Sequence, residues 1–187
     1  MMTEESKREW NRFGKCEHDP RFWKQLQRHE GEKRDRLGRH IVYKCPAGKL
    51  TVGWGHNLEA NPIPLSWFND GQPPHEGQAI TDDCATDLLK ADVAECAKQL
   101  DTWRYYWRFM DTPRQAVVLN MCFNMGITSL RNFEKFSNAL LKEDFVEAAE
   151  QMKKSRWYKQ VGNRSKELVA QMLRNEWMTG DPAEWGE

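Results

Sequence analysis

The sequence predicts an α+β fold in which a small β-containing region precedes an all-helical second half. Two observations lead to this class: short β-like runs are confined to residues 41–58, and apolar residues recur at helical spacing from residue 81 onward. The chain has 187 residues, of which 39% are hydrophobic and 30% are charged. It is therefore long enough for one sizeable domain or for two small lobes.

The first helix is expected after Asp19, an N-cap residue followed by Pro20 at the first helical position. The apolar residues that follow at helical spacing are Phe22, Trp23 and Leu26. Gly31 supplies the stop, which places Glu30 at the C-terminal end of this helix. Residues 1–18 lack a sustained period and are assigned to an N-terminal extension.

Two β-like runs, IVYK and LTVGWG, are expected to form a hairpin or a small sheet. The turn-forming triplet Pro46-Ala47-Gly48 separates them. Residues 61–77 contain four prolines, which predicts a long, mobile connection over the surface.

The second half is predicted to consist of helices. Thr81 can cap a long helix that runs to about residue 100. Thr112-Pro113 starts another helix, which is apolar on nearly all sides before Gly126 and should be the buried central helix. Further helices are expected at 133–142, 144–155 and 163–178.

The composition argues against several classes of function. The net charge is +0, so an overall basic excess for nucleic-acid binding is lacking, and we expect no nucleic-acid partner. The apolar residues never form a run of membrane-spanning length and the first residues lack a secretory core, which predicts synthesis in the cytoplasm without a stable membrane anchor. The five cysteines are odd in number and lack a Cys-x-x-Cys pair, so free thiols are expected, with neither a disulfide framework nor a structural zinc site. We expect no metal and no other cofactor.

A local basic excess lies within residues 151–175. Seven Lys or Arg residues face one acid there, which gives this stretch a net charge of +6. It either attracts polyanions or forms a solvated helix surface.

Three candidate catalytic residues lie in the first third of the chain. Glu30 ends a helix, Cys45 follows one β-run and Thr51 begins the next, so a hairpin can bring them together. Cleaving a glycosidic bond requires a protonated carboxyl group opposite a group that activates or replaces a water molecule. The negative end of a helix dipole favours the protonated form of Glu30, although a glutamate at a helix end is more often an ordinary surface residue.

Several motifs in order resemble the phage-type lysozymes, glycoside hydrolase family 24. They are His29-Glu30-Gly31, Tyr43 to Gly48, Thr51 to His56, Asn120 to Gly126, and Ala148 to Arg164. The resemblance covers roughly residues 20–178. It implies a two-lobed lysozyme-like fold over 19–187, with an N-terminal lobe at 19–80, a connecting helix at 81–100 and a helical C-terminal lobe at 101–187.

The resemblance also implies a muramidase that hydrolyses the β-1,4 bond between N-acetylmuramic acid and N-acetylglucosamine. Glu30 matches the general acid, and Thr51 matches the threonine that helps to hold the attacking water. Cys45 matches a position usually occupied by Asp and in some members by Cys. The family pattern has eight residues between the glutamate and this position, whereas here there are fourteen. Asp35, within the added residues, is therefore a rival for the second catalytic group.

The cysteine poses a question of mechanism, because an unperturbed thiol has a pKa of about 8.5. Its surroundings must lower that value, or the neutral thiol must suffice. Cys45 then either activates water, giving inversion, or attacks the sugar carbon, giving retention through a covalent intermediate.

The remaining matches concern the cleft and the scaffold. The resemblance implies a structural ion pair between His56 and Asp92, and it places Arg164 near the catalytic glutamate. The residues expected to contact sugar are Phe123, Asn124 and Gln151. Trp54 either lines the cleft or anchors the hairpin.

The setting implied by the resemblance is an endolysin that accumulates in the host bacterial cytoplasm and acts on peptidoglycan glycan strands after release. A separate holin-type pore is expected to release it, and the enzyme is expected to be a monomer. Two alternatives remain: a catalytically inactive peptidoglycan-binding module and a phage structural protein with a lysozyme fold.

Overall fold

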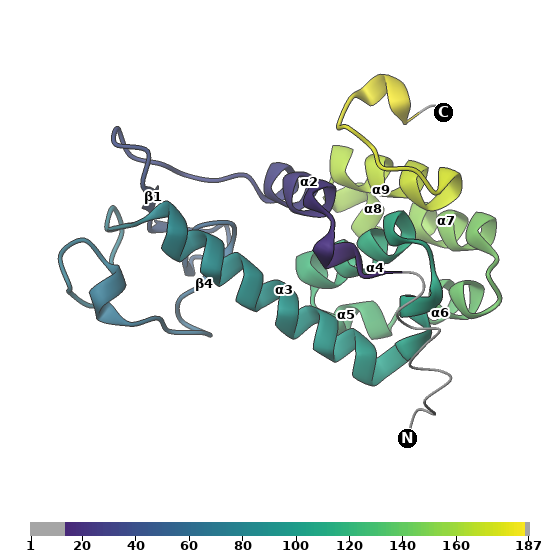
Figure 1. Ribbon diagram of the computed structural model, residues 1–187, viewed down its shortest axis with the longest axis horizontal. Coiled ribbons are helices and arrows are strands. Elements are labelled where there is room, and N and C mark those ends of the chain that lie inside the picture. The colour runs from purple at the N-terminus through teal and green to yellow at the C-terminus, as the bar shows by residue number, and fades with distance from the viewer. Residues whose placement is uncertain (1–13, 186–187) are drawn as a thin grey trace. The chain divides into compact units, whose positions relative to one another are not determined.

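The computed structural model describes residues 14–185, and the chain divides into two compact units. The sheet unit comprises residues Gln27–Glu95, and the helical unit combines the residues up to Leu26 with those from Cys96 onward. All strands of the described residues lie in the sheet unit, whereas the helical unit consists of helices and connections (Figure 1). The α+β class predicted from the sequence is confirmed.

The sheet unit contains two small antiparallel sheets. The strands are β1 (His40–Ile41), β2 (Tyr43–Lys44), β3 (Leu50–Val52), β4 (His56–Asn57) and β5 (Ala79–Ile80). Strand β1 pairs with β5, and the other sheet has the order β2-β3-β4. The expected hairpin is therefore present as β2 and β3. Its second run is shorter than predicted, because the backbone turns at Gly53 and Gly55, which have φ angles of +62° and +89°.

The turn of the hairpin lies between Cys45 and Lys49. Cys45 N–H donates to the Lys49 carbonyl at 2.9 Å, and Gly48 N–H donates to the Cys45 carbonyl at 2.8 Å. Pro46 takes the second turn position, and Gly48 has a φ of +79°. The turn predicted from the Pro-Ala-Gly triplet is thus present, and its geometry is that of a type I turn followed by a glycine bulge.

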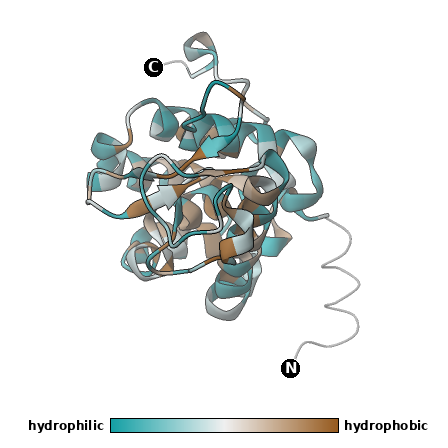
Figure 2. Ribbon diagram, turned by 90° about the vertical axis from the view of Figure 1, so that its left-hand side faces the viewer, coloured by the Kyte–Doolittle hydropathy of each residue, from teal (hydrophilic) through white to brown (hydrophobic). Residues whose placement is uncertain are grey.

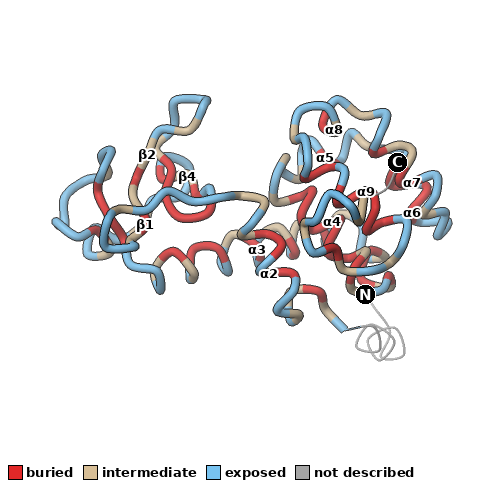
Figure 3. Tube along the Cα trace, turned by 90° about the horizontal axis from the view of Figure 1, so that it is seen from above, coloured by how far each residue is buried: buried red, intermediate tan, exposed pale blue. Residues whose placement is uncertain are grey.

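Two long helices begin or end in the sheet unit. Helix α2 (Pro20–Glu30) has the predicted bounds, since Asp19 Oδ1 accepts the Arg21 N–H at 2.9 Å and Gly31 has a φ of +65°. Helix α3 (Asp82–Arg104) is capped by Thr81, whose Oγ1 accepts the Cys84 N–H at 3.2 Å. It ends four residues later than predicted. The connection at 61–77 contains the short 3₁₀ helix η2 (Leu65–Trp67) and is mostly exposed, drawn in pale blue in Figure 3.

The helical unit is built around α4 (Thr112–Met125), whose residues 115–122 are all buried, as predicted (Figure 3). The other elements are η3 (Tyr105–Phe109), α5 (Ile127–Arg131), α6 (Glu134–Leu141), α7 (Phe145–Lys154), α8 (Arg156–Gln160), α9 (Asn163–Arg174) and η4 (Pro182–Glu184). Many helices carry both hydrophilic and hydrophobic stretches, as expected of helices with one buried face (Figure 2). Helix α9 stops before residue 178 because Asn175 adopts the left-handed conformation, with a φ of +58°.

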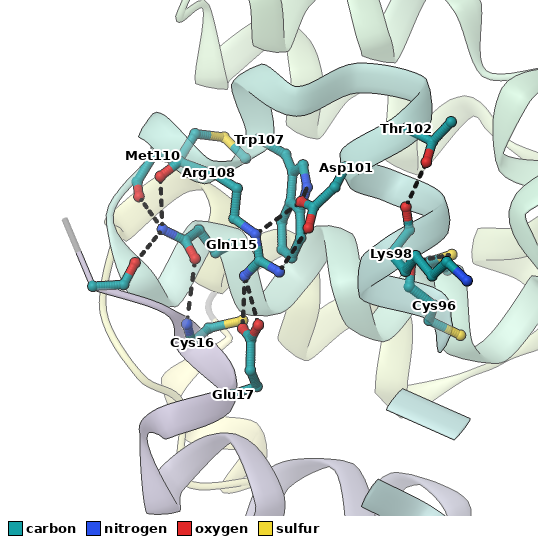
Figure 4. A network of polar contacts seen from close by, with 12 residues as sticks. Cys16, Glu17, Cys96, Lys98, Asp101, Thr102, Trp107, Arg108, Met110 and Gln115 are labelled. Atoms are coloured by element: carbon teal, nitrogen blue, oxygen red, sulfur yellow. Dashed lines mark hydrogen bonds and ion pairs between the residues drawn. The ribbon is translucent and has the colours of Figure 1, made fainter. Parts of the chain in front are cut away.

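The short 3₁₀ helix η1 (Cys16–His18) packs on α4, although the sequence placed it in an extension. Cys16 is fully buried, and its N–H donates to Gln115 Oε1 at 3.3 Å. Beside it, the buried guanidinium of Arg108 bonds Glu17 at 2.7 Å and Asp101 at 2.9 Å (Figure 4). Cys16 and Glu17 are thus joined to Gln115 and Arg108 by buried or partly buried polar contacts.

Candidate active site

The hairpin of the sheet unit brings three reactive side chains together. Tyr43 on β2 lies opposite Thr51 on β3 in the antiparallel register. Cys45 follows two residues after Tyr43, and in a strand this spacing places both side chains on the same face. Thr51 is 4% exposed, and its Oγ1 donates to the Lys49 carbonyl at 3.1 Å.

The turn around Cys45 stabilises a thiolate. The Lys49 backbone N–H makes the largest contribution in lowering the pKa of the Cys45 thiol, and the Ala47 N–H lowers it further. The Thr51 hydroxyl also lowers it when its single proton turns from the Lys49 carbonyl to the sulfur. Partial burial opposes this effect without cancelling it. A sulfur that accepts several hydrogen bonds is stabilised in its charged form, so the turn supplies the lowered pKa that a cysteine in this position requires.

Tyr43 is influenced electrostatically by both Glu30 and the Cys45 thiol. Burial raises the pKa of the Tyr43 phenol, and the negative charges of Glu30 and then Cys45 raise it further, which places the phenol within electrostatic reach of both. Tyr43 was not singled out from the sequence. The signal that identifies it is its spacing of two residues from Cys45 together with its register opposite Thr51.

Glu30 also lies against the turn that follows β3. A Cβ atom built on Gly55 would lie 3.4 Å from Glu30 Oε2, so the absence of a side chain at Gly55 leaves room beside the carboxyl group. The sheet unit therefore combines a carboxyl group, a phenol, a thiol of lowered pKa and a hydroxyl. These groups are suited to acid–base and nucleophilic chemistry.

Asp35, the rival for the second catalytic group, stabilises its own turn. Its Oδ1 accepts the N–H groups of Leu37 and Arg39, each at 2.9 Å, and its Oδ2 lies 2.7 Å from Arg39 Nη2. Burial opposes ionisation, but these hydrogen bonds prevail and the pKa of Asp35 is lowered. Both oxygens are thus engaged within residues 35–39.

His56 and Asp92 form the pair that the sequence analysis expected. His56 Nδ1 lies 2.8 Å from Asp92 Oδ2, and Nε2 lies 2.7 Å from the Asn61 carbonyl. Burial lowers the pKa of His56, but the hydrogen bond and charge of Asp92, helped by the Asn61 carbonyl, outweigh it, so the pKa is raised. The pair joins β4 to α3 and contributes to the scaffold.

The expected substrate contacts lie in the helical unit. Asn124 is exposed on α4 and its Oδ1 accepts the Trp157 indole N–H at 2.8 Å, while its neighbour Phe123 is half-buried. Gln151 lines a hollow of about 440 Å³ on this unit and donates to Glu147 Oε1 at 2.6 Å. Arg164 is buried, and its Nε donates to Asn120 Oδ1 at 2.9 Å. The approach of Arg164 to Glu30 stays a prediction.

The basic stretch at residues 151–175 does not expose all of its Lys and Arg side chains. Six of its seven Lys and Arg residues are exposed, whereas Arg164 is buried. Within residues 14–185, no three His, Cys, Asp or Glu side chains are grouped so as to hold a metal ion. In the same part of the chain, the helices are too short or too polar to cross a membrane.

Comparison with known proteins identifies the family. The profile of the family described as phage lysozyme matches residues 34–175, which is more than half of the chain. The chain belongs to the phage lysozyme family. The match includes Cys45 and Thr51 and begins after Glu30.

Individual relatives agree with this assignment. The chain is 26% identical over 157 residues to "Probable T4-type lysozyme 1" of Dictyostelium discoideum, covering 78% of this chain and 89% of that protein. It is 24% identical to "Probable T4-type lysozyme 2" of the same organism, with the same coverage. It is also 26% identical to the pre-baseplate central spike protein Gp5 of Enterobacteria phage T4, covering 75% of this chain but only 26% of the spike protein.

Proposed function

We propose that the chain is a muramidase that hydrolyses the β-1,4 bond between N-acetylmuramic acid and N-acetylglucosamine in peptidoglycan. The observation that carries this proposal is the placement of four groups in the sheet unit: Cys45 follows β2, Tyr43 lies opposite Thr51 in the hairpin, and the Glu30 carboxyl group lies beside Gly55. The lowered pKa of the Cys45 thiol supports it. Membership of the phage lysozyme family supports a lysozyme-like activity.

In the proposed reaction, Glu30 donates its proton to the glycosidic oxygen as the bond between this oxygen and the sugar carbon breaks. In the inverting route, the Cys45 thiolate takes a proton from a water molecule, and the water oxygen bonds to the sugar carbon. In the retaining route, the sulfur itself bonds to this carbon. Water then displaces the sulfur and gives a proton to the Glu30 carboxylate. Both routes leave Thr51 to hold the water.

Asp35 is the weaker choice for the second group. Its two oxygens are occupied by Arg39 and by the backbone of its own turn. A carboxylate engaged in this way would have to break the turn before it could activate water or attack a sugar. Cys45 is therefore the group that we assign.

The helical unit is proposed to supply the further substrate contacts. Gln151 lines the hollow of that unit, and Asn124 is exposed on α4. Phe123 and Arg164 complete the proposed group. The five exposed basic residues of α7 to α9 other than Lys153, which pairs with Glu150 at 2.9 Å, favour attraction to an acidic cell wall.

The proposed biological role is that of an endolysin. The enzyme would accumulate in the host bacterial cytoplasm, reach the wall through a separate holin-type pore, and lyse the cell as a monomer. The match to a phage spike protein favours a second candidate, in which the chain is the lysozyme-fold module of a phage structural protein. Mass spectrometry of purified phage particles distinguishes the two, because only a structural protein is retained in the particle at stoichiometric amounts.

The activity is tested by turbidity clearing of outer-membrane-permeabilised Gram-negative cells, with mass analysis of the released fragments. Wild type should release fragments with reducing muramic acid ends. Glu30→Gln and Cys45→Ala should each lose activity by about 100-fold or more, whereas Cys45→Asp should keep much of it. Asp35→Asn is the control and should clear cells at nearly the wild-type rate.

Three outcomes would count against the proposal. If Cys45→Ala clears cells as fast as wild type, the assignment of Cys45 is wrong. If Asp35→Asn loses activity as Glu30→Gln does, the second group is Asp35. If wild type is inert but sediments with peptidoglycan, the chain is a binding module.

A further inference from the structure

A small hairpin separates Glu30 from β1. Arg34 forms an antiparallel bridge with His40, and the Ile41 N–H donates to the Lys33 carbonyl at 3.0 Å. At the tip, the Asp35 N–H donates to the Arg39 carbonyl at 2.9 Å. The residues added between Glu30 and Cys45 therefore form a defined structure next to the catalytic glutamate.

An ion cluster connects this hairpin to α3. Arg34 Nη2 lies 2.7 Å from Glu32 Oε2 and 2.7 Å from Asp82 Oδ1. Asp82 is the first residue of α3, and its Oδ1 also lies 3.2 Å from His40 Nε2. Arg34 thus bridges the two carboxylates, and His40 shares one of them.

His40 connects this ion cluster to the buried interior of the sheet unit. Its side chain is fully buried, and its ring packs edge-to-face on Trp54 with the ring centroids 4.5 Å apart. Burial, followed by the charge of Arg34, lowers the pKa of His40 despite Glu32 and Asp82, which favours a neutral imidazole. A neutral ring has one N–H, and Nε2 is the atom with acceptors, so this nitrogen donates to the cluster while the ring edge supports Trp54.

Trp54 in turn sits at the centre of the turn beside Glu30. It is 7% exposed and lies between two glycines with positive φ angles. A Cβ on Gly53 would lie 3.4 Å from Ala85 Cβ on α3, and one on Gly55 would lie 3.4 Å from Glu30 Oε2. The turn therefore fits closely between α3 and the Glu30 carboxyl group, and a shift of Trp54 would move the backbone that borders this carboxyl group.

We propose that Arg34 and His40 are positioning residues for Glu30. Arg34 fastens the added hairpin to α3, and this contact holds His40 against Trp54. The fixed indole then holds Gly55 beside the Glu30 carboxyl group. This proposal rests on the proposed function, because it assigns to the ion cluster a role in orienting the general acid.

The kinetic test uses soluble peptidoglycan oligosaccharides and measures kcat and KM separately. Arg34→Ala should lower kcat by about 10- to 100-fold with little change in KM, because the loss is one of orientation and leaves substrate contacts in place. Arg34→Lys, which retains the charge, should recover part of the loss. Arg39→Ala is the matched control: it removes an equal charge and a 2.7 Å ion pair from the same hairpin but leaves the cluster around His40 intact.

A second measurement does not depend on activity. The indole N–H resonance of Trp54 is assigned with Trp54→Phe and followed by NMR in each variant. It should broaden or shift in Arg34→Ala and in His40→Leu but not in Arg39→Ala. If wild type fails to cleave glycan but the variants show this pattern, the proposed function is wrong, while the support of Trp54 by Arg34 and His40 is confirmed.

The positioning role is overturned by either of two results. One is an unchanged Trp54 resonance in Arg34→Ala, which would mean that the cluster does not hold the indole. The other is an equal loss of kcat in Arg34→Ala and Arg39→Ala, which would mean that the hairpin acts through its charge or its folding alone.

Discussion

The two units of this chain are stabilised by different kinds of interaction. In the helical unit, α4 is buried along residues 115–122, and the neighbouring helices contribute apolar faces to the same core. In the sheet unit, each strand has only two or three residues, and its order depends on turns, ion pairs and positive-φ glycines. The candidate catalytic side chains come from the sheet unit. Their placement thus depends on polar contacts that single substitutions can remove.

The largest expected effect is on the free energy of unfolding, and it concerns the buried guanidinium of Arg108 in the helical unit. Arg108→Ala should lower the free energy of unfolding by about 3–5 kcal/mol, because it leaves the half-buried carboxylates of Glu17 and Asp101 without their cation. Urea unfolding measures the change. Burial raises the pKa of Glu17, but Arg108 outweighs this and lowers it. The stabilisation is therefore present at neutral pH and is lost as the pH falls through the folded-state pKa.

Lys153→Ala is the matched control for that comparison. Lys153 pairs with Glu150 at 2.9 Å, but both side chains are 42% exposed and solvent screens their charges, so its loss should change the stability far less than Arg108→Ala. Equal losses of unfolding free energy in Arg108→Ala and Lys153→Ala would show that burial does not make the Arg108 ion pairs more important for stability than the exposed one.

The next largest effect concerns the scaffold of the sheet unit. Asp92→Asn should destabilise the protein by about 2–3 kcal/mol at pH 5, because the buried imidazolium of His56 loses its charged partner. The folded-state pKa of His56 is raised, so the contribution of the pair is fully present below the unfolded-state pKa. It is lost as the pH rises through the folded-state value. Unfolding at pH 5 and pH 9 checks this, and a cost that does not decrease at pH 9 would contradict it.

A third prediction distinguishes the effect of backbone strain on stability from the effect of a new side chain beside Glu30 on the rate. Gly38 and Gly55 have φ angles of +79° and +89°, so alanine at either position should cost about 1–2 kcal/mol. A Cβ on Gly38 meets open space, whereas one on Gly55 would lie 3.4 Å from Glu30 Oε2. Only Gly55→Ala should therefore lower the rate of glycan cleavage, by about 10-fold. Equal rates of glycan cleavage in Gly38→Ala and Gly55→Ala would show that a side chain at position 55 does not disturb the Glu30 carboxyl group.

The same contrast explains what could be predicted from the sequence. Helix α4 and the bounds of α2 follow from local signals, namely apolar spacing, a proline at the start and a glycine at the end. The short helices α5 and α8 were missed, because five residues do not establish a helical period. The division of IVYK between β1 and β2 was also missed, since Val42 donates its N–H to the distant Gln78 carbonyl.

For the candidate site, sequence motifs located Glu30, Cys45 and Thr51, but they could not supply their surroundings. The pKa of the Cys45 thiol depends on where the Lys49 and Ala47 N–H groups point, which only the folded turn determines. The cluster of Arg34, His40 and Asp82 joins residues up to 48 positions apart. Such contacts leave no periodic signal in a single sequence.

The smallest expected effect concerns the pKa of the Cys45 thiol. Thr51→Val removes a hydroxyl with little change in shape, so it should cost only about 1 kcal/mol of stability. The pKa of Cys45 should nevertheless rise, because the Thr51 hydroxyl is one of the groups that lower it. Alkylation by iodoacetamide, followed at Cys45 by peptide mass spectrometry across pH, should show its midpoint moved to higher pH.

Thr102→Val is the control for this measurement. The Thr102 hydroxyl also donates to a backbone carbonyl, that of Lys98 at 2.9 Å, but it lies on the part of α3 that belongs to the helical unit. It should leave the midpoint of Cys45 unchanged. The shift in Thr51→Val should be partial, because the Lys49 N–H makes the largest contribution and remains in place. No shift at all would mean that backbone N–H groups alone lower the pKa of Cys45, and the proposed role of Thr51 would then be confined to the attacking water.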